Sequence, residues 1–267
     1  MVTTRSSTLA PPDDRFFLAL ERAGSSLLIL DYDGTLAPFR VKRDEAVPYD
    51  GVREALFSIG GSPHTSVVVV TGRALSEIDR LLGVEPLPEI WASHGWEHRS
   101  PDGDVTAFPL PNGARGALDQ ALQRAGDAGL RSACEVKPAS VALHWRGLPR
   151  EQAASIEQRG RELWGPTAAE SVLELHSFDG GLELRVPGLD KGTAVRSIVD
   201  DAGPDTVVAF LGDDLTDEAA FRALPETALS VLVRGEARPT AAKSWLRPPE
   251  GLLAFLRQWA AAMGGDA

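Results

Sequence analysis

Two aspartates separated by a single residue could carry out phosphoryl chemistry in this sequence. Asp31 and Asp33 stand in the stretch Asp-Tyr-Asp-Gly-Thr, directly after the apolar run Ser26–Leu30. One carboxylate could attack phosphorus and form an aspartyl phosphate. The other could protonate the leaving oxygen and then deprotonate the attacking water. A solvated acidic turn would have the same composition, so this stretch alone leaves both interpretations open.

Two further polar stretches suit the same chemistry. Thr71-Gly72-Arg73 follows the apolar run Ser66–Val70, and a hydroxyl with backbone N–H groups at that point could hold phosphate oxygens. Lys191 begins a predicted helix, where its ammonium group could offset negative charge on a phosphate and on the nucleophile. A surface lysine at a helix start is the alternative for Lys191 taken alone.

The acidic stretch Gly212–Glu218 offers ligands for a metal ion. It follows the apolar run 207–211, and its first two aspartates, Asp213 and Asp214, supply the hard oxygen ligands that Mg²⁺ prefers. Either one could complete a magnesium site begun by the aspartates at 31 and 33. The alternative is a helix N-cap, which Thr216 would provide, and both interpretations can hold together.

These polar stretches need a sheet that brings strand ends together. The compact apolar runs predict buried parallel strands, and the stretches between them have helical spacing. We expect strands over 26–30, 66–70, 89–93, 207–211 and 229–233 and helices over 52–59, 74–82, 191–201, 217–223 and 252–263. Ligands bind beyond the carboxyl ends of such strands, where the polar stretches lie.

The middle of the chain has a different pattern. Asp102-Gly103 predicts a hairpin turn, and helices over 115–125 and 151–163 alternate with strands over 134–145, 172–175 and 182–186. This block indicates an inserted α+β unit. The predicted fold is an α/β, Rossmann-like core with a parallel sheet, made from residues 1–108 and 181–267, with an α+β cap at 109–180.

Composition narrows the class of protein. The 267 residues are 43% hydrophobic and 24% charged, which is ordinary for a globular protein, and the net charge of -11 argues against nucleic-acid binding. Cys134 is the single cysteine and cannot form an internal disulfide; a buried, unreactive thiol is the favoured interpretation. Residues 1–16 do not read as a signal peptide, and no apolar run is long enough for a membrane span. We expect a cytoplasmic monomer that binds a small molecule, with no nucleic-acid or membrane partner.

The ordered motifs resemble those of the haloacid dehalogenase (HAD) superfamily of phosphohydrolases. The stretch from Asp31 matches its first motif, Thr71 its second, Lys191 its third and the stretch from Gly212 its fourth. The insert lies where that superfamily places its larger α+β cap. The expected fold is therefore a HAD core with a cap.

This resemblance implies a role for each matching residue. Asp31 would be the nucleophile and Asp33 the general acid/base, while Thr71 and Lys191 would hold the phosphoryl group. Mg²⁺ would be bound by Asp31, the backbone carbonyl of Asp33 and Asp213.

A narrower resemblance, to the trehalose-6-phosphate phosphatases, covers nearly the whole chain. The matching stretches are LDYDGTLAPF from Leu30, VVTGR from Val69, ASHGWEHR from Ala92, EVK from Glu135, ALHWR from Ala142, LELRVPGLDKGTAV from Leu182 and FLGDDLTDEAAF from Phe210. It implies trehalose 6-phosphate as the substrate. The implied substrate-binding positions are Gly72, Arg73, His94, Gly95, Arg99, Glu135, Lys137, Arg146 and Glu183.

Several alternatives stay open. Glu135 and Lys137 could be an exposed pair on one strand face, and Trp96 and Trp145 are better explained by core packing. The substrate could instead be a glucosyl or mannosyl glycerate phosphate or a phosphorylated pseudo-disaccharide. A phosphomutase with a related cap is a further rival. A non-catalytic sugar-phosphate sensor would be expected to lack one of the paired aspartates, and both are present.

Overall fold

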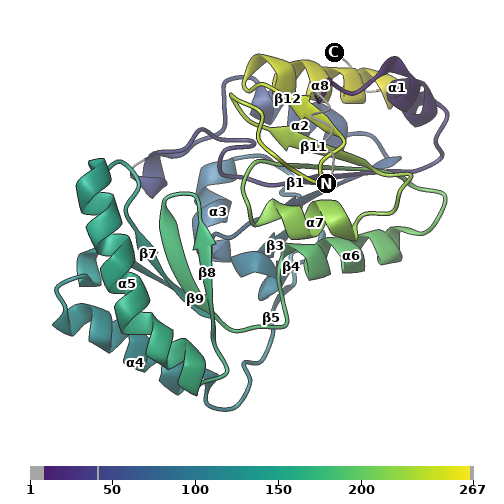
Figure 1. Cartoon of the computed structure of the whole chain (residues 1–267). Coiled ribbons are helices and arrows are strands. Elements are labelled where there is room, and N and C mark those ends of the chain that lie inside the picture. Colours follow the sequence, from purple (N-terminus) through teal and green to yellow (C-terminus); the bar gives the residue numbers. More distant parts are fainter. Residues whose placement is uncertain (1–8, 41, 265–267) are drawn as a thin grey trace, which may run out of the picture.

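The computed structural model describes residues 9–40 and 42–264. Residues 1–8, half of the segment expected not to be a signal peptide, lie outside this description. The chain forms a larger part built on an eight-stranded sheet and a smaller part built on a four-stranded sheet (Figure 1). Within the described residues, no helix is both long and apolar enough to cross a membrane.

The larger part has the expected parallel sheet. Its strands lie in the order β12 (Ser244–Leu246), β11 (Leu229–Val233), β10 (Val207–Gly212), β1 (Ser26–Leu30), β2 (Thr65–Val70), β3 (Glu89–Ala92), β4 (Glu97–Arg99) and β5 (Val105–Ala107). All pairs from β12 to β3 are parallel, and the β4–β5 hairpin adds antiparallel strands at one edge. β1 lies between β10 and β2, so strands from both ends of the chain flank it.

Helices cover both faces of this sheet, as a buried parallel sheet requires. One face carries α1 (Asp14–Glu21), α2 (Val52–Gly60), α3 (Leu75–Leu82) and α8 (Glu250–Ala262). The other carries α6 (Lys191–Ala202) and α7 (Asp217–Ala223). Two short 3₁₀ turns, Arg43–Glu45 and Ser93–Gly95, lie in the loops after β1 and β3.

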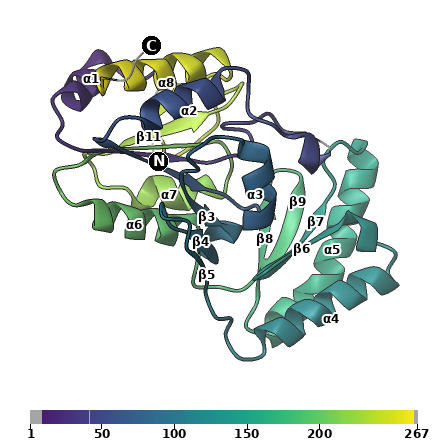
Figure 2. The same cartoon turned by 180° about the vertical axis from the view of Figure 1, so that it is seen from behind.

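The smaller part is the α+β insert. Its antiparallel sheet has the order β6 (Cys134–Lys137), β7 (Ser140–His144), β9 (Gly181–Arg185) and β8 (Glu174–Phe178), backed by α4 (Ala114–Asp127) and α5 (Arg150–Glu170) (Figure 2). The boundary expected after residue 180 separates β8 from β9, which pair with each other. The second crossing between the two parts therefore comes after Arg185.

Four elements differ from the sequence prediction. The short helix α1 and the three-residue strand β12 were not expected, because each offers too few residues for a clear period. α5 continues past 163, through Pro166, to Glu170. β8 starts at Glu174 rather than 172, since Val172 is exposed despite its apolar side chain.

Candidate active site

Strand ends bring the predicted catalytic residues together. Leu30 of β1 pairs with Leu211 of β10 on one side and Val69 of β2 on the other, so the residues that follow these strands are neighbours. The backbone N–H of Asp31 continues this pairing and donates to the Leu211 carbonyl at 2.9 Å. The sheet register therefore places Asp31 between the second and fourth motifs.

Lys191 lies between two buried carboxylates. Its Nζ is 2.5 Å from Asp31 Oδ1 and 2.7 Å from Asp217 Oδ1. Asp190 caps the helix that Lys191 begins and thereby fixes the lysine backbone. Burial alone would lower the lysine pKa, but Asp217 and Asp31 raise it above the ordinary value, so Lys191 stays an ammonium. Burial raises the pKa of Asp31 to about 7, and Lys191 counteracts only part of that rise.

Three buried carboxylates form a group that could hold a divalent cation. Oxygens of Asp31, Asp213 and Asp217 lie within 4.8 Å of one another. Both carboxylate oxygens of Asp213 are buried without a hydrogen-bond partner, and burial together with Asp31 and Asp217 raises its pKa well above the ordinary value. An unpaired buried carboxylate is costly unless a cation compensates it. The chemistry of these ligands therefore fits Mg²⁺.

The carboxylates of two predicted metal-binding residues lie outside this group. The Asp33 carboxylate faces Arg73 instead, which leaves only the backbone carbonyl of Asp33 as the implied ligand. The Asp214 carboxylate accepts the backbone N–H groups of Leu215 and Asp179, so it too lies outside the group. Asp217 takes the third place. The sequence held a signal for it, since it is the third aspartate of the acidic stretch.

Asp217 also folds the loop that carries Asp213. Its Oδ2 accepts the backbone N–H groups of Asp213 and Asp214 at 2.8 and 2.9 Å. The expected cap, Thr216, makes no side-chain capping hydrogen bond. Gly34 completes the close packing: its φ is +81°, and a Cβ there would lie 2.2 Å from Asp213 Oδ2.

Asp33 is held by a bidentate pair. Arg73 Nε and Nη2 donate to its two carboxylate oxygens at 2.7 and 2.6 Å. Arg73 is buried and also lies 3.5 Å from Glu77. Arg73 was predicted to bind substrate directly, but in this structure it binds the predicted general acid/base.

The insert presents a polar face to the core. In its sheet, Ala142 of β7 pairs with Glu135 of β6 and with Glu183 of β9, so both glutamates lie on one face beside a small residue. Lys137 lies on the same face, because it is two residues from Glu135. The alternating residues of the opposite face pack on the two helices.

These side chains are paired and largely buried. Lys137 Nζ and Ser140 Oγ donate to Glu183 Oε1 at 2.9 and 2.7 Å, and His94 of the core lies 3.4 Å from Glu183. Burial would raise the pKa of Glu183, but Lys137 and His94 hold it well below 4.5. Glu135 contacts His144 at 2.7 Å and Arg43 of the core. The interpretation of Glu135 and Lys137 as an exposed pair is therefore wrong.

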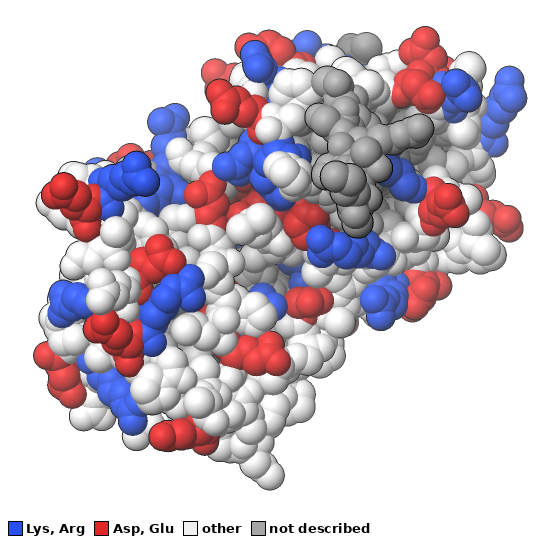
Figure 3. All heavy atoms as spheres, viewed as in Figure 1, with Lys and Arg blue, Asp and Glu red and all other residues white. Residues whose placement is uncertain are grey.

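Asp31 and Asp213 of the carboxylate group and the polar face of the insert line one cavity of about 720 Å³ between core and insert. Of the predicted residues, it brings together Asp31, Asp33, Thr71, Gly72, Arg73, His94, Glu135, Lys137, Arg146, Glu183, Lys191, Asp213 and Asp214. On the face in Figure 3, acidic and basic side chains are interspersed, and both kinds flank the depression between the two parts. Sequence reasoning missed Arg43, Glu77 and His144, which also line the cavity.

Two predicted residues lie outside the cavity lining. Arg99 instead pairs with Asp79 at 2.5 Å and donates to the Pro88 carbonyl at 2.9 Å. Gly95 turns the chain with a φ of +102°. The two tryptophans considered as core residues do pack in the insert, with Trp96 buried and Trp145 partly buried. The prediction of a substrate contact is not supported for Arg99 or Gly95.

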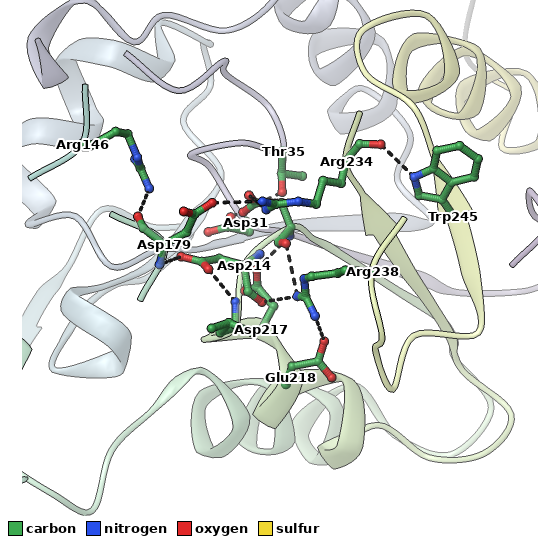
Figure 4. A network of polar contacts seen from close by, with 12 residues as sticks. Asp31, Thr35, Arg146, Asp179, Asp214, Asp217, Glu218, Arg234, Arg238 and Trp245 are labelled. Carbon is green, nitrogen blue, oxygen red and sulfur yellow. Dashed lines mark hydrogen bonds and ion pairs between the residues drawn. The ribbon is translucent and has the colours of Figure 1, made fainter. Parts of the chain in front are cut away.

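Arg238 supports the fourth motif from outside. It donates to the backbone carbonyls of Asp213 and Asp214 at 3.2 and 2.7 Å and to Glu218 at 2.5 Å (Figure 4). Because it lies 25 residues beyond Asp213, the sequence gave no spacing signal for this contact.

Comparison with known proteins agrees with this geometry. The trehalose-phosphatase family model matches residues 29–247. The chain is 31% identical to a bifunctional trehalose-6-phosphate synthase/phosphatase of Thermoproteus tenax over 242 residues, 89% of this chain and 32% of the relative. It is 31% identical to a trehalose-phosphate phosphatase of Mycobacterium ulcerans over 249 residues, 85% of this chain and 60% of that relative. The chain thus spans about a third and three fifths of these two relatives.

The fold matches as well. The C-terminal domain of the C. albicans trehalose-6-phosphate phosphatase superposes with a TM-score of 0.82 over 96% of this chain and 99% of that domain, at 21% identity. The family match covers both parts of the core and the entire insert. The chain belongs to the trehalose-phosphatase family.

Proposed function

We propose that this chain hydrolyses trehalose 6-phosphate to trehalose and phosphate. The observation that carries the proposal is that the acidic strand-end site and the polar face of the insert line the same cavity. One end suits a phosphoryl group and the other suits sugar hydroxyls. The family membership and the names of the two relatives support this substrate.

Asp31 is the proposed nucleophile. Its carboxylate attacks phosphorus, the bond from phosphorus to the sugar oxygen breaks, and an aspartyl phosphate forms. Lys191 stays protonated and offsets charge on Asp31 and the phosphoryl oxygens. Thr71 follows β2 at the same sheet edge, where its hydroxyl is available to a phosphoryl oxygen.

Asp33 is the proposed general acid and base. It donates a proton to the departing sugar oxygen, then takes one from the water that cleaves the aspartyl phosphate. The bidentate pair with Arg73 occupies both Asp33 oxygens in this structure. We therefore infer that substrate binding loosens this pair, so that one oxygen of Asp33 can carry the proton.

Asp31, Asp213 and Asp217, with the backbone carbonyl of Asp33, would hold Mg²⁺. When bound, the ion would offset negative charge on the phosphoryl oxygens and on Asp31. Phosphate release should therefore stop with a chelator and return when Mg²⁺ is added. Activity that survives exhaustive chelation would contradict this role for Asp213.

The insert is the proposed sugar-reading part. Lys137 donates hydrogen bonds, whereas Glu135 and Glu183 accept them. A sugar hydroxyl group can both accept and donate a hydrogen bond, so it can pair with either kind of side chain. A site that hydrogen-bonds a hydroxyl group rejects an analogue without it, because its own buried groups then stay unpaired. We propose that the insert closes over the bound sugar and excludes water.

A panel of sugar phosphates tests the substrate. We would compare kcat/KM for trehalose 6-phosphate, glucose 6-phosphate and glucosyl and mannosyl glycerate phosphates, with phosphate release as the readout. Trehalose 6-phosphate should be the best substrate. A higher kcat/KM for another compound, or isomerisation without phosphate release, would overturn the proposal. The cytoplasmic location, the monomeric state and the lack of a nucleic-acid partner stay predictions.

A further inference from the structure

The turn between β8 and β9 reaches from the insert to the core. The Asp179 backbone N–H donates to Asp214 Oδ2 at 3.4 Å, and its carboxylate accepts Arg234 Nη2 at 3.0 Å (Figure 4). Arg146 donates to the Asp179 carbonyl, and its guanidinium lies 3.9 Å from the ring centre of Phe39. The turn therefore contacts the loop that carries the predicted metal ligand.

Arg234 lies between two carboxylates that belong to different parts of the molecule. Besides Asp179 of the insert, its guanidinium is 3.7 Å from Asp213 Oδ2 of the core. The Arg234 backbone is fixed beside β12, because its N–H donates to the Leu246 carbonyl at 3.0 Å. Only the side chain of Arg234 can therefore move between Asp179 and Asp213.

The carboxylates of Asp179 and Asp213 differ in their access to water and in their hydrogen-bond partners. Asp179 is about half exposed, with 45% of its side chain accessible, so water can solvate it. Asp213 is buried, and neither of its oxygens has a hydrogen-bond partner. The neighbouring Arg238 is already bound to Glu218 and to backbone carbonyls. Arg234 is therefore the guanidinium that can move toward Asp213.

We propose that Arg234 is a positioning residue that couples closure of the insert to metal binding. When the β8–β9 turn is docked, as in this structure, Asp179 holds the guanidinium beyond hydrogen-bond distance of Asp213, at 3.7 Å, so that both Asp213 oxygens stay available to a divalent cation. When the turn moves away, Asp213 is the acceptor within reach, and Arg234 competes with the cation. Linkage requires the reverse effect, so a bound cation favours the docked turn by the same factor. This inference rests on the magnesium site of the proposed function.

Mg²⁺ titration by calorimetry tests the coupling. Asp179→Asn keeps the backbone contact to Asp214 but releases Arg234, so Mg²⁺ should bind about threefold to fivefold more weakly, as expected from a strong half-exposed ion pair. Arg234→Gln should bind Mg²⁺ at least as tightly as the wild type. Adding Asp179→Asn to Arg234→Gln should then change nothing further. Asp102→Asn, which removes an exposed charge in the β4–β5 turn, is the matched control.

Hydrogen exchange measures whether the β8–β9 turn is docked, which the Mg²⁺ affinity alone does not report. Mg²⁺ should slow amide exchange in residues 178–181 of the wild type and leave these amides unchanged in Arg234→Gln. Unchanged Mg²⁺ affinity in Asp179→Asn would overturn the coupling. An equal loss of affinity with and without Arg234 would also overturn it. No sugar phosphate enters these measurements, so a failed substrate panel and a failed coupling give different results.

Discussion

The two ends of the cavity use the same kinds of side chain in different balance. At the core end, the ammonium group of Lys191 lies between Asp31 and Asp217, and Asp213 is a third buried carboxylate beside them, so carboxylates outnumber the ammonium. Burial then raises the pKa of Asp31 to about 7, and neither carboxylate oxygen of Asp213 has a hydrogen-bond partner.

At the insert end the charges are matched. Lys137 pairs with Glu183, and Arg43 with Glu135. The pKa of Glu183 is held well below 4.5, the opposite direction from Asp31. The surplus of negative charge at the core end favours binding of a cation. The insert end, where the charges are matched, can form hydrogen bonds with uncharged hydroxyl groups. The difference therefore supports the proposed division of the cavity into a catalytic end and a specificity end.

The largest expected effect is at the core end. Asp31→Asn keeps the shape of the side chain but removes the nucleophile, so kcat should fall by about 10⁴-fold or more. The measurement is phosphate release from trehalose 6-phosphate, with circular dichroism to check the fold. Asp102→Asn should keep wild-type kcat. Near-normal turnover by folded Asp31→Asn would contradict the assignment of the nucleophile, and with it the assignment of the core end as catalytic.

A smaller effect, which depends on the substrate, is expected at the insert end. Glu183→Gln leaves Lys137 with only the more distant Glu135, at 3.9 Å, as a charged partner and weakens hydrogen bonds to the sugar, so kcat/KM for trehalose 6-phosphate should fall about 10- to 100-fold. p-Nitrophenyl phosphate has no sugar to read and should be hydrolysed at nearly the wild-type rate. Glu174→Gln, at an exposed position of β8, is the matched control. An equal loss with both substrates would instead assign Glu183 to the chemical step.

The two ends should also differ in their response to pH. Asp31, with a pKa raised to about 7, is mostly protonated at pH 6 and mostly ionised at pH 8. Because the proton competes with the cation, Mg²⁺ affinity should rise about tenfold over this range. Glu183 stays ionised throughout, so binding of unphosphorylated trehalose should change little. Calorimetric titrations at pH 6, 7 and 8 measure both, and a flat Mg²⁺ affinity would contradict the surplus of charge at the core end.

The smallest effect on catalysis is expected at Arg99. Arg99→Ala removes contacts to Asp79 and the Pro88 carbonyl, which should lower the free energy of unfolding by about 1–2 kcal/mol. Since Arg99 does not line the cavity, kcat/KM should stay at the wild-type value. Urea denaturation and the phosphate-release assay measure the two quantities. A large loss of kcat/KM at unchanged stability would instead indicate that Arg99 contributes to substrate binding at the specificity end.

The catalytic end was predictable because its signals are local. Asp31 and Thr71 each follow an apolar run directly, and Lys191 begins a helix after a capping aspartate. Parallel strands gather their carboxyl ends, so these residues must meet once the sheet forms. The specificity end was named through family resemblance, since no local spacing relates Lys137 to Glu183.

The sequence by itself determined the kinds of element, the order of the motifs and the choice of Asp31 as the proposed nucleophile, because short-range periodicity and strand-end position encode them. Tertiary structure alone decided the partners. Asp217, not Asp214, joins Asp31 and Asp213 in the carboxylate group, Arg73 binds Asp33, and Arg99 binds Asp79 outside the cavity lining. Each of these outcomes depends on the register of the sheet and on which oppositely charged side chains become neighbours in the interior. The sequence does not specify either one locally, because both depend on how distant segments pack.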